Sequence, residues 1–357
     1  MRVGLVFGGR SVEHRVSVSS ARTVAAGLRN AGHEVVGLGI APDGCWVPRQ
    51  AAEAALAGEI DAFEPLGTAI AESLSHLLEA RLEIVFPVVH GTWGEDGTLQ
   101  GLCEMLDLAY VGADVTASAI AMDKLQCKRL LSASGIAVVD FEAVTAAEMR
   151  DAGADALRRL ERLPLPLFVK PSCGGSSVGV RRVDARQEVE AAVRFALRFD
   201  DAVVVEEGIV GRELECSVLG DETLEASVIG EVVPGNDFYD YQDKYLQDEA
   251  GLEMPARLSP EQTAEIRSMA VEAFAAIGGS GMARVDFLMA EDDTLYVNEI
   301  NTLPGFTRIS MYPKLWDLSG LPLDRLVDRL VDIGRRRHER RRQLDNGIKN
   351  WLAAIDS

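Results

Sequence analysis

Residues 281–306, GMARVDFLMAEDDTLYVNEINTLPGF, restrict the possible fold more than any other stretch of this 357-residue chain. Two apolar runs typical of β-strands flank the polar segment EDDT at 291–294. If EDDT forms a four-residue hairpin loop, Ala290 pairs with Leu295. The stretch therefore predicts an antiparallel hairpin whose register follows from the loop.

Four polar residues interrupt the two runs, namely Arg284, Asp286, Glu299 and Asn301. In this register Asp286 faces Glu299 and Arg284 faces Asn301, and the alternation of side chains directs all four to one side. Two carboxylates directly opposite each other repel, by roughly 4 kcal/mol at about 4 Å and an intermediate dielectric. Oxygen ligands of this kind suit a hard ion such as Mg²⁺. Taken alone, the residues leave three interpretations open: a bound metal ion, neutralisation by Arg284, or a different register.

Composition excludes several classes of protein. The chain is long enough for two or three domains, and its 47% hydrophobic and 26% charged residues predict a large core with an ordinary surface. A net charge of −20 argues against general binding to nucleic acids or anionic membranes. The five cysteines form no CxxC pair, which favours reduced thiols in a cytoplasmic protein.

The first half of the chain predicts a parallel sheet followed by an α+β unit. Residues 1–112 alternate strand-like and helix-like segments, and the N-terminal run MRVGLVFGGR is expected to be a first strand rather than a signal peptide. No stretch approaches the ~18 apolar residues of a membrane span. Residues 113–209 read as a central α+β unit that contains a glycine-rich loop, and 210–357 as a C-terminal unit with the hairpin. The basic cluster at 335–342 is expected to be a solvated helix face.

A glycine-rich loop and three lysines indicate phosphate binding. The segment FVKPSCGGSSVGV (168–180) joins two strand-like runs through a loop whose N–H groups can wrap phosphate oxygens. It is not the GxxxxGK[ST] of a P-loop, and alone it is as typical of a flexible hairpin tip. Lys124, Lys170 and Lys244 end or interrupt apolar segments, and together with paired carboxylates they supply what Mg-nucleotide binding needs.

Two further stretches are candidates for ligand contact. VVVEEGIVGREL (203–214) places Glu206 and Glu207 at a strand end, where backbone groups could read an adenine edge and Glu213 could accept from ribose hydroxyls. An ordinary acidic turn is the simpler explanation of that segment alone. HGTWGEDGTLQG (90–101) follows an apolar strand, and the glycines after His90 favour a shaped turn at a ligand site.

Seven stretches of the chain, some of them described above, together resemble the D-alanine–D-alanine ligase family of ATP-grasp enzymes. The resemblance covers residues 1 to about 330 and is carried, in order, by FGGRSVEHRVSVSSA, HGTWGEDGTLQG, AMDKLQCK, FVKPSCGGSSVGV, FYDYQDKYL, GMARVDF and NEINTLPGFTRISMYPKL. It implies an ATP-grasp fold of α/β and α+β class with an N-terminal parallel-sheet domain. It also implies an enzyme that joins two D-alanines through an acylphosphate, releasing ADP and phosphate, for peptidoglycan precursor synthesis.

The resemblance assigns roles to individual positions. Two Mg²⁺ (or Mn²⁺) ions would bind Asp286, Glu299 and Asn301, while Arg284 and the backbone N–H of Gly305 would stabilise the oxyanion. ATP would contact Lys124, Lys170, Ser177, Glu206, Glu207, Glu213 and Lys244. The D-alanines would contact Glu13, His90, Ser310 and the Met311 backbone. Ser176 and Tyr245 would link to Glu13 and close an ω-like loop, 235–250, over the site, which keeps water from the acylphosphate.

The resemblance also bears on the acceptor and on partners. Lys244 and Tyr245 favour a D-amino-acid acceptor, and D-Ala–D-Ser or D-Ala–D-Lac ligase is the alternative within the family. Arg15, Cys173 and Arg308 are less typical of the family. A homodimer in the cytoplasm is suggested, with no nucleic acid or membrane as partner. Activation by a monovalent cation is left open, and the tail 335–357 receives no role.

Overall fold

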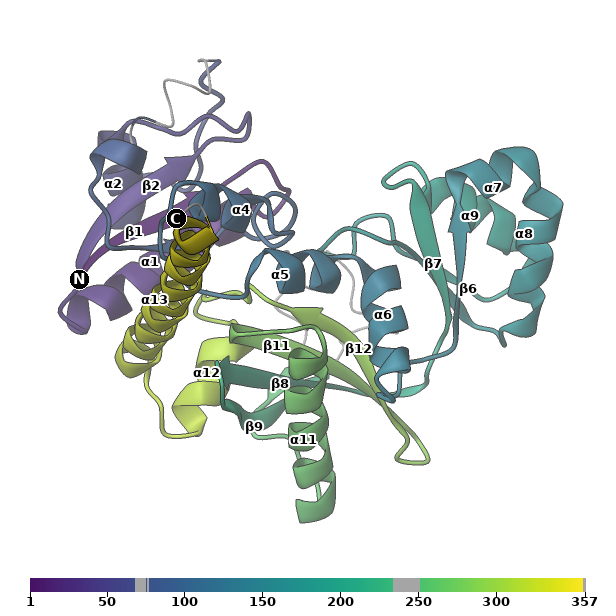
Figure 1. Ribbon diagram of the computed structural model, residues 1–357. Coiled ribbons are helices and arrows are strands. Elements are labelled where there is room, and N and C mark those ends of the chain that lie inside the picture. Colours follow the sequence, from purple (N-terminus) through teal and green to yellow (C-terminus); the bar gives the residue numbers. More distant parts are fainter. Residues whose placement is uncertain (68–74, 76, 234–250, 356–357) are drawn as a thin grey trace.

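The computed structural model describes residues 1–67, 75, 77–233 and 251–355, and arranges them around three β-sheets (Figure 1). The predicted combination of α/β and α+β units is confirmed. The predicted ω-like loop 235–250, with Lys244 and Tyr245, lies outside the described residues. The three-part division at 112/113 and 209/210 stays a prediction.

The N-terminal sheet is parallel, with β1 (Arg2–Gly8) between β2 (Glu34–Ile40) and β3 (Ile84–Pro87). Its strands are almost entirely apolar, because helices cover both faces. One face packs on α1 (His14–Asn30), α2 (Arg49–Ala57) and the first turns of α13 (Leu323–Ile355), and the other on α4 (Thr98–Met105). The turns after β1 and β3 therefore emerge at one edge, where ligands bind in such sheets.

The second sheet is antiparallel and forms the right-hand unit in Figure 1. Its helices share one core with the strands. Their order is β4-β7-β5-β6, and the glycine-rich loop joins β5 to β6. The elements are β4 (Phe141–Thr145), α7 (Ala146–Asp151), α8 (Gly153–Arg159), β5 (Leu167–Pro171), β6 (Arg181–Val183), α9 (Val189–Ala196) and β7 (Ala202–Glu207).

The third sheet is a five-stranded antiparallel layer with the order β10-β9-β8-β11-β12. One face packs on α5, α6 and α11. Helix α12 packs on β8 and β9, and its Met311 and Leu315 side chains share a small apolar cluster with Val232 of β9. The elements are α5 (Val115–Met122), α6 (Lys124–Ala133), β8 (Gly211–Gly220), β9 (Leu224–Val233), β10 (Gly251–Glu253), α11 (Pro260–Ala276), β11 (Gly281–Ala290), β12 (Leu295–Asn301) and α12 (Met311–Leu318).

The hairpin of β11 and β12 exists as predicted, but the register predicted for the residues next to its loop is wrong. Met289, not Ala290, is paired with Leu295, and the Ala290 N–H instead donates to the Thr294 carbonyl at 2.9 Å. A β-bulge then adds one residue to β12 after Asp286, which restores the predicted pairing of Asp286 with Glu299. The functional half of the hairpin is therefore in the predicted register.

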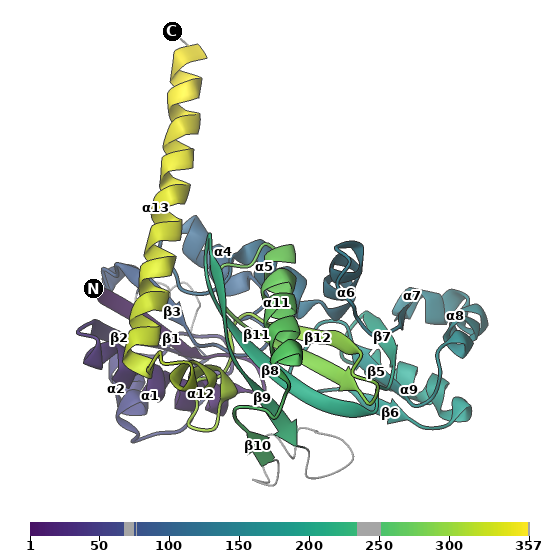
Figure 2. The same ribbon diagram turned by 90° about the horizontal axis from the view of Figure 1, so that it is seen from below.

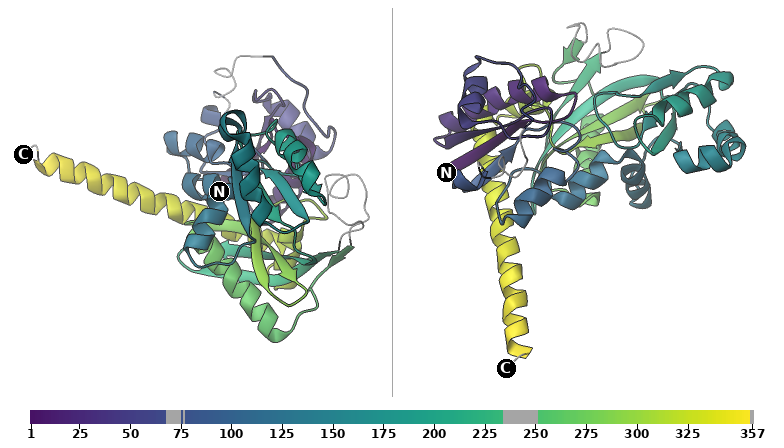
Figure 3. Two further views of the ribbon diagram at one scale, coloured as in Figure 1. Left: turned by 90° about the vertical axis from the view of Figure 1, so that its right-hand side faces the viewer. Right: turned by 90° about the horizontal axis from the view of Figure 1, so that it is seen from above.

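Helix α13 begins against the N-terminal sheet and then extends away from the rest of the molecule (Figures 2 and 3). Leu326 and Leu330 are fully buried, whereas every residue from Arg341 to Ile355 is exposed. The basic cluster is a solvated face only in part. Arg337 stacks over the Tyr110 ring, with its guanidinium 4.3 Å from the ring centre, and donates to backbone carbonyls. Within the described ranges, the helices are all too short or too polar to cross a membrane.

Candidate active site

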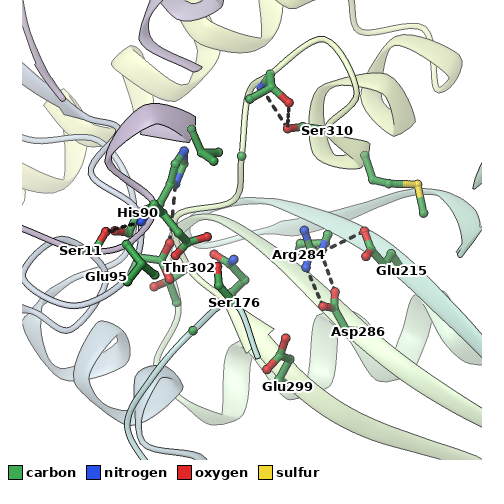
Figure 4. A pocket seen from close by; sticks show the side chains of 18 of the residues that line it. Ser11, His90, Glu95, Ser176, Glu215, Arg284, Asp286, Glu299, Thr302 and Ser310 are labelled. Carbon is green, nitrogen blue, oxygen red and sulfur yellow. Dashed lines mark hydrogen bonds and ion pairs between the residues drawn. The ribbon is translucent and has the colours of Figure 1, made fainter. Parts of the chain in front are cut away.

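A cavity of ≈1190 Å³ lies where the N-terminal turns, the glycine-rich loop and the polar face of β11 and β12 meet (Figure 4). Its volume is sufficient for a nucleotide together with small substrates. Most of the residues singled out from the sequence line it: Glu13, His90, Lys124, Ser176, Glu213, Arg284, Asp286, Glu299, Asn301, Gly305, Ser310 and Met311. Arg15 and Arg308, the two atypical arginines, line it as well.

Among the predicted residues that the structure describes, four do not line the cavity. Lys170 and Glu206 lie just behind its wall, where Lys170 reaches Asn298, a lining residue, at 3.4 Å. Glu207 ends β7, and its N–H donates to the Asp140 carbonyl. Ser177 follows Ser176 in the glycine-rich loop.

Arg284 is bound between two carboxylates. Its Nε and Nη2 donate to the two oxygens of Asp286, both at 2.7 Å, and Nε also lies 3.0 Å from Glu215 Oε2 (Figure 4). Burial lowers the pKa of Arg284, but the attraction of Asp286 and Glu215 outweighs it, so the pKa rises further above its ordinary value. The repulsion expected between Asp286 and Glu299 is thus relieved in part by Arg284.

Glu215 was not identified from the sequence. It is on β8, directly across from Asp286 in the β8–β11 pairing. The signal was present, because RELEC places Glu213 and Glu215 two residues apart and so on one face of a strand. What could not be inferred was that β8 is the neighbour of β11.

The donor set on the hairpin fits a hard divalent cation. Asp286, Glu299 and Asn301 line the cavity from the two paired strands. They offer carboxylate oxygens and one amide oxygen, which are the ligands that such a cation prefers. The Asn301 amide is oriented, because its Oδ1 accepts from the Leu303 N–H at 2.9 Å. Within the described ranges, no three His, Cys, Asp or Glu side chains cluster as a complete metal site. Such a cation would therefore need further oxygens, from water or phosphate.

Lys124 connects this face to the glycine-rich loop. Its Nζ donates to the Gly174 carbonyl at 2.7 Å and lies 3.8 Å from Glu299 Oε2. In the loop, Ser176 and Ser177 have φ angles of 53° and 57°, which turns successive N–H groups toward one side. The loop is therefore shaped to hold an anion beside Lys124.

Glu206 is a buried carboxylate held by two lysines. Lys170 Nζ donates to Oε2 at 2.8 Å, and Lys128 Nζ lies 3.2 Å from Oε1. Burial raises the pKa of Glu206, but the two cations lower it more, so the net shift is downward. Burial lowers the pKa of Lys128. The Glu206 carboxylate is therefore already occupied by two lysines, and Lys128 is a residue that the sequence did not reveal.

His90 and two carboxylates form the corner next to the N-terminal sheet. His90 Nδ1 lies 3.1 Å from the Leu303 carbonyl and 3.6 Å from Glu95 Oε1, and Nε2 lies 3.0 Å from Ser20 Oγ. Burial lowers the pKa of His90, but Glu95 and Glu13 raise it more, so the net shift is upward. Burial raises the pKa of Glu95.

Two glycines fix the place of Glu13. A Cβ on Gly91 would lie 3.0 Å from Glu13 Oε2, and one on Gly175 would lie 3.3 Å from the same oxygen. The carboxylate therefore lies between the turn after β3 and the glycine-rich loop, as expected of a residue that contacts a ligand under that loop. Glu95 was noted in the sequence only as part of a turn.

The far end of the cavity is formed by the N-terminus of α12. Ser310 precedes the helix, and its Oγ accepts from the Thr307 N–H at 2.9 Å. A Cβ on Gly305 would lie 2.7 Å from that oxygen, so only glycine fits there without displacing Ser310. Because a helix N-terminus favours negative charge, this end suits a carboxylate.

Comparison with protein families identifies both parts of the chain. Residues 2–113 match the protein-family model described as D-ala D-ala ligase N-terminus, and residues 130–332 match the family model described as D-ala D-ala ligase C-terminus.

Curated relatives and solved structures agree. The chain is 45% identical to the D-alanine–D-alanine ligase of Solibacter usitatus (96% of this chain, 97% of that protein) and 42% identical to D-alanine–D-alanine ligase A of Escherichia coli K12 (99% of each). The D-alanine–D-alanine ligase structure from Coxiella burnetii superposes with a TM-score of 0.81 at 34% identity, covering 100% of this chain and 99% of that one. The VanG D-Ala:D-Ser ligase of Enterococcus faecalis superposes with a TM-score of 0.79 at 32% identity, covering 93% of this chain and 99% of that one.

Proposed function

Since the chain belongs to the D-alanine–D-alanine ligase family, we propose that its central cavity joins two D-alanines to D-alanyl-D-alanine and converts ATP to ADP and phosphate. The observation that carries the proposal is the convergence of three features on one cavity: an oxygen-donor face, an anion-binding loop and a helix N-terminus. The product would serve peptidoglycan precursor synthesis.

The first D-alanine would bind at the corner of Glu13 and His90. Its ammonium group would contact the Glu13 carboxylate, whose place below the glycine-rich loop suits a small substrate. His90, whose pKa Glu95 and Glu13 raise, would lie beside that substrate. The substrate carboxylate then takes the γ-phosphoryl group of ATP and becomes an acylphosphate.

The phosphates would lie between the glycine-rich loop and the hairpin. Lys124 and Lys170 would neutralise them, with Ser176, Ser177 and the loop N–H groups around the oxygens. A Mg²⁺ ion held by Asp286, Glu299 and Asn301 would offset the phosphate charge during transfer. We propose two such ions, with Mn²⁺ as a substitute.

The nucleoside would lie toward β7 and β8. Glu213 lines the cavity and would accept from the ribose hydroxyls. The backbone of Glu206 and Glu207, rather than the Glu206 carboxylate, would read the adenine edge. Lys244 would add a further phosphate contact.

The second D-alanine would bind at the N-terminus of α12. Its carboxylate would contact Ser310 and the Met311 backbone, and its amine would attack the acylphosphate. Arg284 and the Gly305 N–H would stabilise the oxyanion that forms, and phosphate then leaves. Ser176 and Tyr245, linked to Glu13, would close the site and exclude water, which would otherwise hydrolyse the acylphosphate.

We further propose that the protein is a homodimer located in the cytoplasm. Each copy would consist of three units, at 1–112, 113–209 and 210–357. A monovalent cation as activator is an additional hypothesis, tested by comparing K⁺ with Na⁺ in the same assay.

The test is phosphate release from ATP and Mg²⁺ with D-alanine, with D-alanine plus D-lactate or D-serine, and with L-alanine, followed by mass identification of the product. We expect release with D-alanine alone and a dipeptide of two alanines. Turnover only after D-serine or D-lactate is added would overturn the acceptor and leave the carboxylate-activating step in place. No turnover with any substrate would contradict the proposal.

A further inference from the structure

Ser20 belongs to α1, is fully buried, and is not among the residues that line the cavity. Its Oγ nevertheless contacts two segments of the cavity wall that are far from it in the sequence. It lies 3.0 Å from Nε2 of His90, and it accepts from the Phe306 N–H at 3.1 Å. One hydroxyl group therefore joins α1 to the turn after β3 and to the segment that follows β12.

The donors and acceptors of these contacts determine where the hydrogens lie. A backbone N–H can only donate, so the Phe306 N–H occupies one lone pair of the Ser20 oxygen. The Leu303 carbonyl, 3.1 Å from Nδ1 of His90, can only accept, so Nδ1 carries a proton. When the ring is neutral, Nε2 therefore has a lone pair, and the hydroxyl hydrogen of Ser20 is directed to it.

His90 and Ser20 together hold the chain on both sides of Gly305. His90 binds the carbonyl of Leu303, two residues before Gly305, and Ser20 binds the N–H of Phe306, the residue after it. The side chains of Leu303 and Phe306 are themselves buried in the core of the N-terminal sheet. The Gly305 N–H therefore lies between two anchored peptide groups.

Gly305 needs this support because it is a glycine. A Cβ there would lie 2.7 Å from Ser310 Oγ, so a larger residue does not fit without displacing that serine. Glycine, however, has the least restricted backbone of all residues, and a donor stabilises an oxyanion best when it is already oriented before the reaction. The ring of Pro304 fixes one dihedral angle. The contacts at Leu303 and Phe306 restrict the others.

We propose that Ser20 is a positioning residue for the ligation step. Through the Phe306 N–H, and together with His90, it holds the Gly305 N–H in the direction in which the oxyanion forms. This rests on the proposed function, in which the Gly305 N–H stabilises that oxyanion. Ser20 touches no substrate in this assignment, so its loss slows the reaction without changing how ATP binds.

Ser17, one turn earlier on the same helix, offers a matched control. It is also fully buried, accepts from the Gly8 N–H, and donates to the Val88 carbonyl. Ser17→Ala therefore removes a buried hydroxyl group with two partners, as Ser20→Ala does. The contacts of Ser17 join β1 to the end of β3, however, and leave the anchors of Gly305 in place.

The first test measures kcat and KM for the two alanine variants by phosphate release, and their stability by urea unfolding. We expect Ser20→Ala to lower kcat about 10-fold or more and to leave the KM for ATP within about two-fold of the parent, because a misplaced oxyanion donor affects the transition state. Ser17→Ala should lose stability to a similar degree and keep kcat within a few-fold of the parent. Ser20→Cys retains a weak donor and acceptor, so its kcat should lie between those of Ser20→Ala and the parent. Equal losses of kcat in the two alanine variants, or a parent-like kcat in Ser20→Ala, would overturn the proposal.

The second test needs no turnover, so it separates failure of this proposal from failure of the proposed function. Nitrogen-15 spectra of the five histidines show which ring nitrogen carries the proton, and His90→Gln assigns the signal. At a pH at which His90 is neutral, we expect the proton on Nδ1 in the parent. The Nε2 signal should shift in Ser20→Ala and stay in place in Ser17→Ala. A proton on Nε2 in the parent, or an Nε2 signal that Ser20→Ala leaves unchanged, would refute the role of Ser20. A parent that joins no D-alanines contradicts the proposed function, whatever these spectra show.

Discussion

Arg284 holds Asp286 through two hydrogen bonds of 2.7 Å, side by side on the same strand. The carboxylate assigned to the metal is therefore already neutralised by a built-in cation, which is also the group assigned to the oxyanion. Because one Asp286 serves both partners, a metal ion that binds it has to weaken the pair with Arg284, and Glu215 is then the carboxylate that still holds the arginine.

Arg284→Gln should separate these two roles. Without the competing guanidinium, Mn²⁺ should bind more tightly to the enzyme in the absence of nucleotide, as measured by electron paramagnetic resonance. Turnover should fall by roughly 10²-fold or more, because an oxyanion donor is lost. The matched control is Arg212→Gln, which removes a similar bidentate pair with Glu231 outside the cavity lining. Weaker Mn²⁺ binding in Arg284→Gln would contradict the competition.

Asp286→Asn should remove most of the phosphate release, by at least ~10³-fold, because an amide is a weaker ligand for a hard divalent cation and carries no charge. Thermal unfolding should show that the fold persists. Asp292→Asn in the hairpin loop makes the same chemical change at an exposed residue and should retain activity. Comparable activity of the two variants would sink the metal assignment.

Glu206→Gln should destabilise the protein by about 3–5 kcal/mol at neutral pH, because two lysines then remain buried without their counter-charge. Lys128→Met should cost less, since it leaves the pair of Lys170 with Glu206 intact. Urea unfolding measures both, with Glu207→Gln as the control on the neighbouring residue.

The difference between the parent and Glu206→Gln should depend on pH. The folded-state pKa of Glu206 is lowered by the lysines, so its contribution is present above the unfolded pKa of ~4.3 and is lost as the pH falls through the folded value. A gap that stays constant down to acid pH would contradict the ionised state of Glu206.

Glu95→Gln should lower the pKa of His90, because Glu95 makes the largest contribution that raises it. The stabilisation from protonated His90 is fully present below the unfolded pKa of ~6.5 and is lost as the pH rises through the folded value. Nuclear magnetic resonance titration of the five histidines follows this directly, and His90→Gln assigns the signal. An unchanged titration midpoint would show that Glu95 does not act on His90.

Gly305→Ala should raise the KM for the second D-alanine about 10-fold or more and affect the KM for ATP little. The new methyl group would lie 2.7 Å from Ser310 Oγ and displace it from Thr307, and misplacements of this size are costly in an active site. Gly101→Ala, on a helix with no atom within 4 Å of the new methyl, is the control. An ATP-specific defect would place Gly305 elsewhere in the reaction.

The hairpin shows how a sequence can predict a site for a partly wrong reason. The alternation of apolar and polar residues predicts both strands correctly, but the predicted loop is one residue shorter than the loop in the structure. The bulge in β12 compensated for the error, so Asp286 still faces Glu299. A bulge is a local backbone arrangement with no strong composition of its own, and it could not be inferred from the residues.

The residues that sequence reasoning missed owe their position to tertiary contacts. Lys128 is one helical turn beyond Lys124, yet it points to Glu206 from the second sheet, whereas Lys124 points to the glycine-rich loop. Glu215 matters because β8 lies beside β11, which pairs Glu215 with Asp286, 71 residues further along the chain. The motifs could be identified from the sequence because each is a short continuous stretch. Lys128 and Glu215 could not, because their contacts depend on how separate units pack together.

The core of the N-terminal sheet has a consequence for synthesis of the chain. Val3, Leu5 and Phe7 share that core with Phe306, Tyr312 and the buried start of α13. A ribosome that adds roughly 5–20 residues per second needs on the order of 15–60 s to make the intervening chain. During that time the first strand is without its final cover, so the nascent protein depends on being shielded until its last helix arrives.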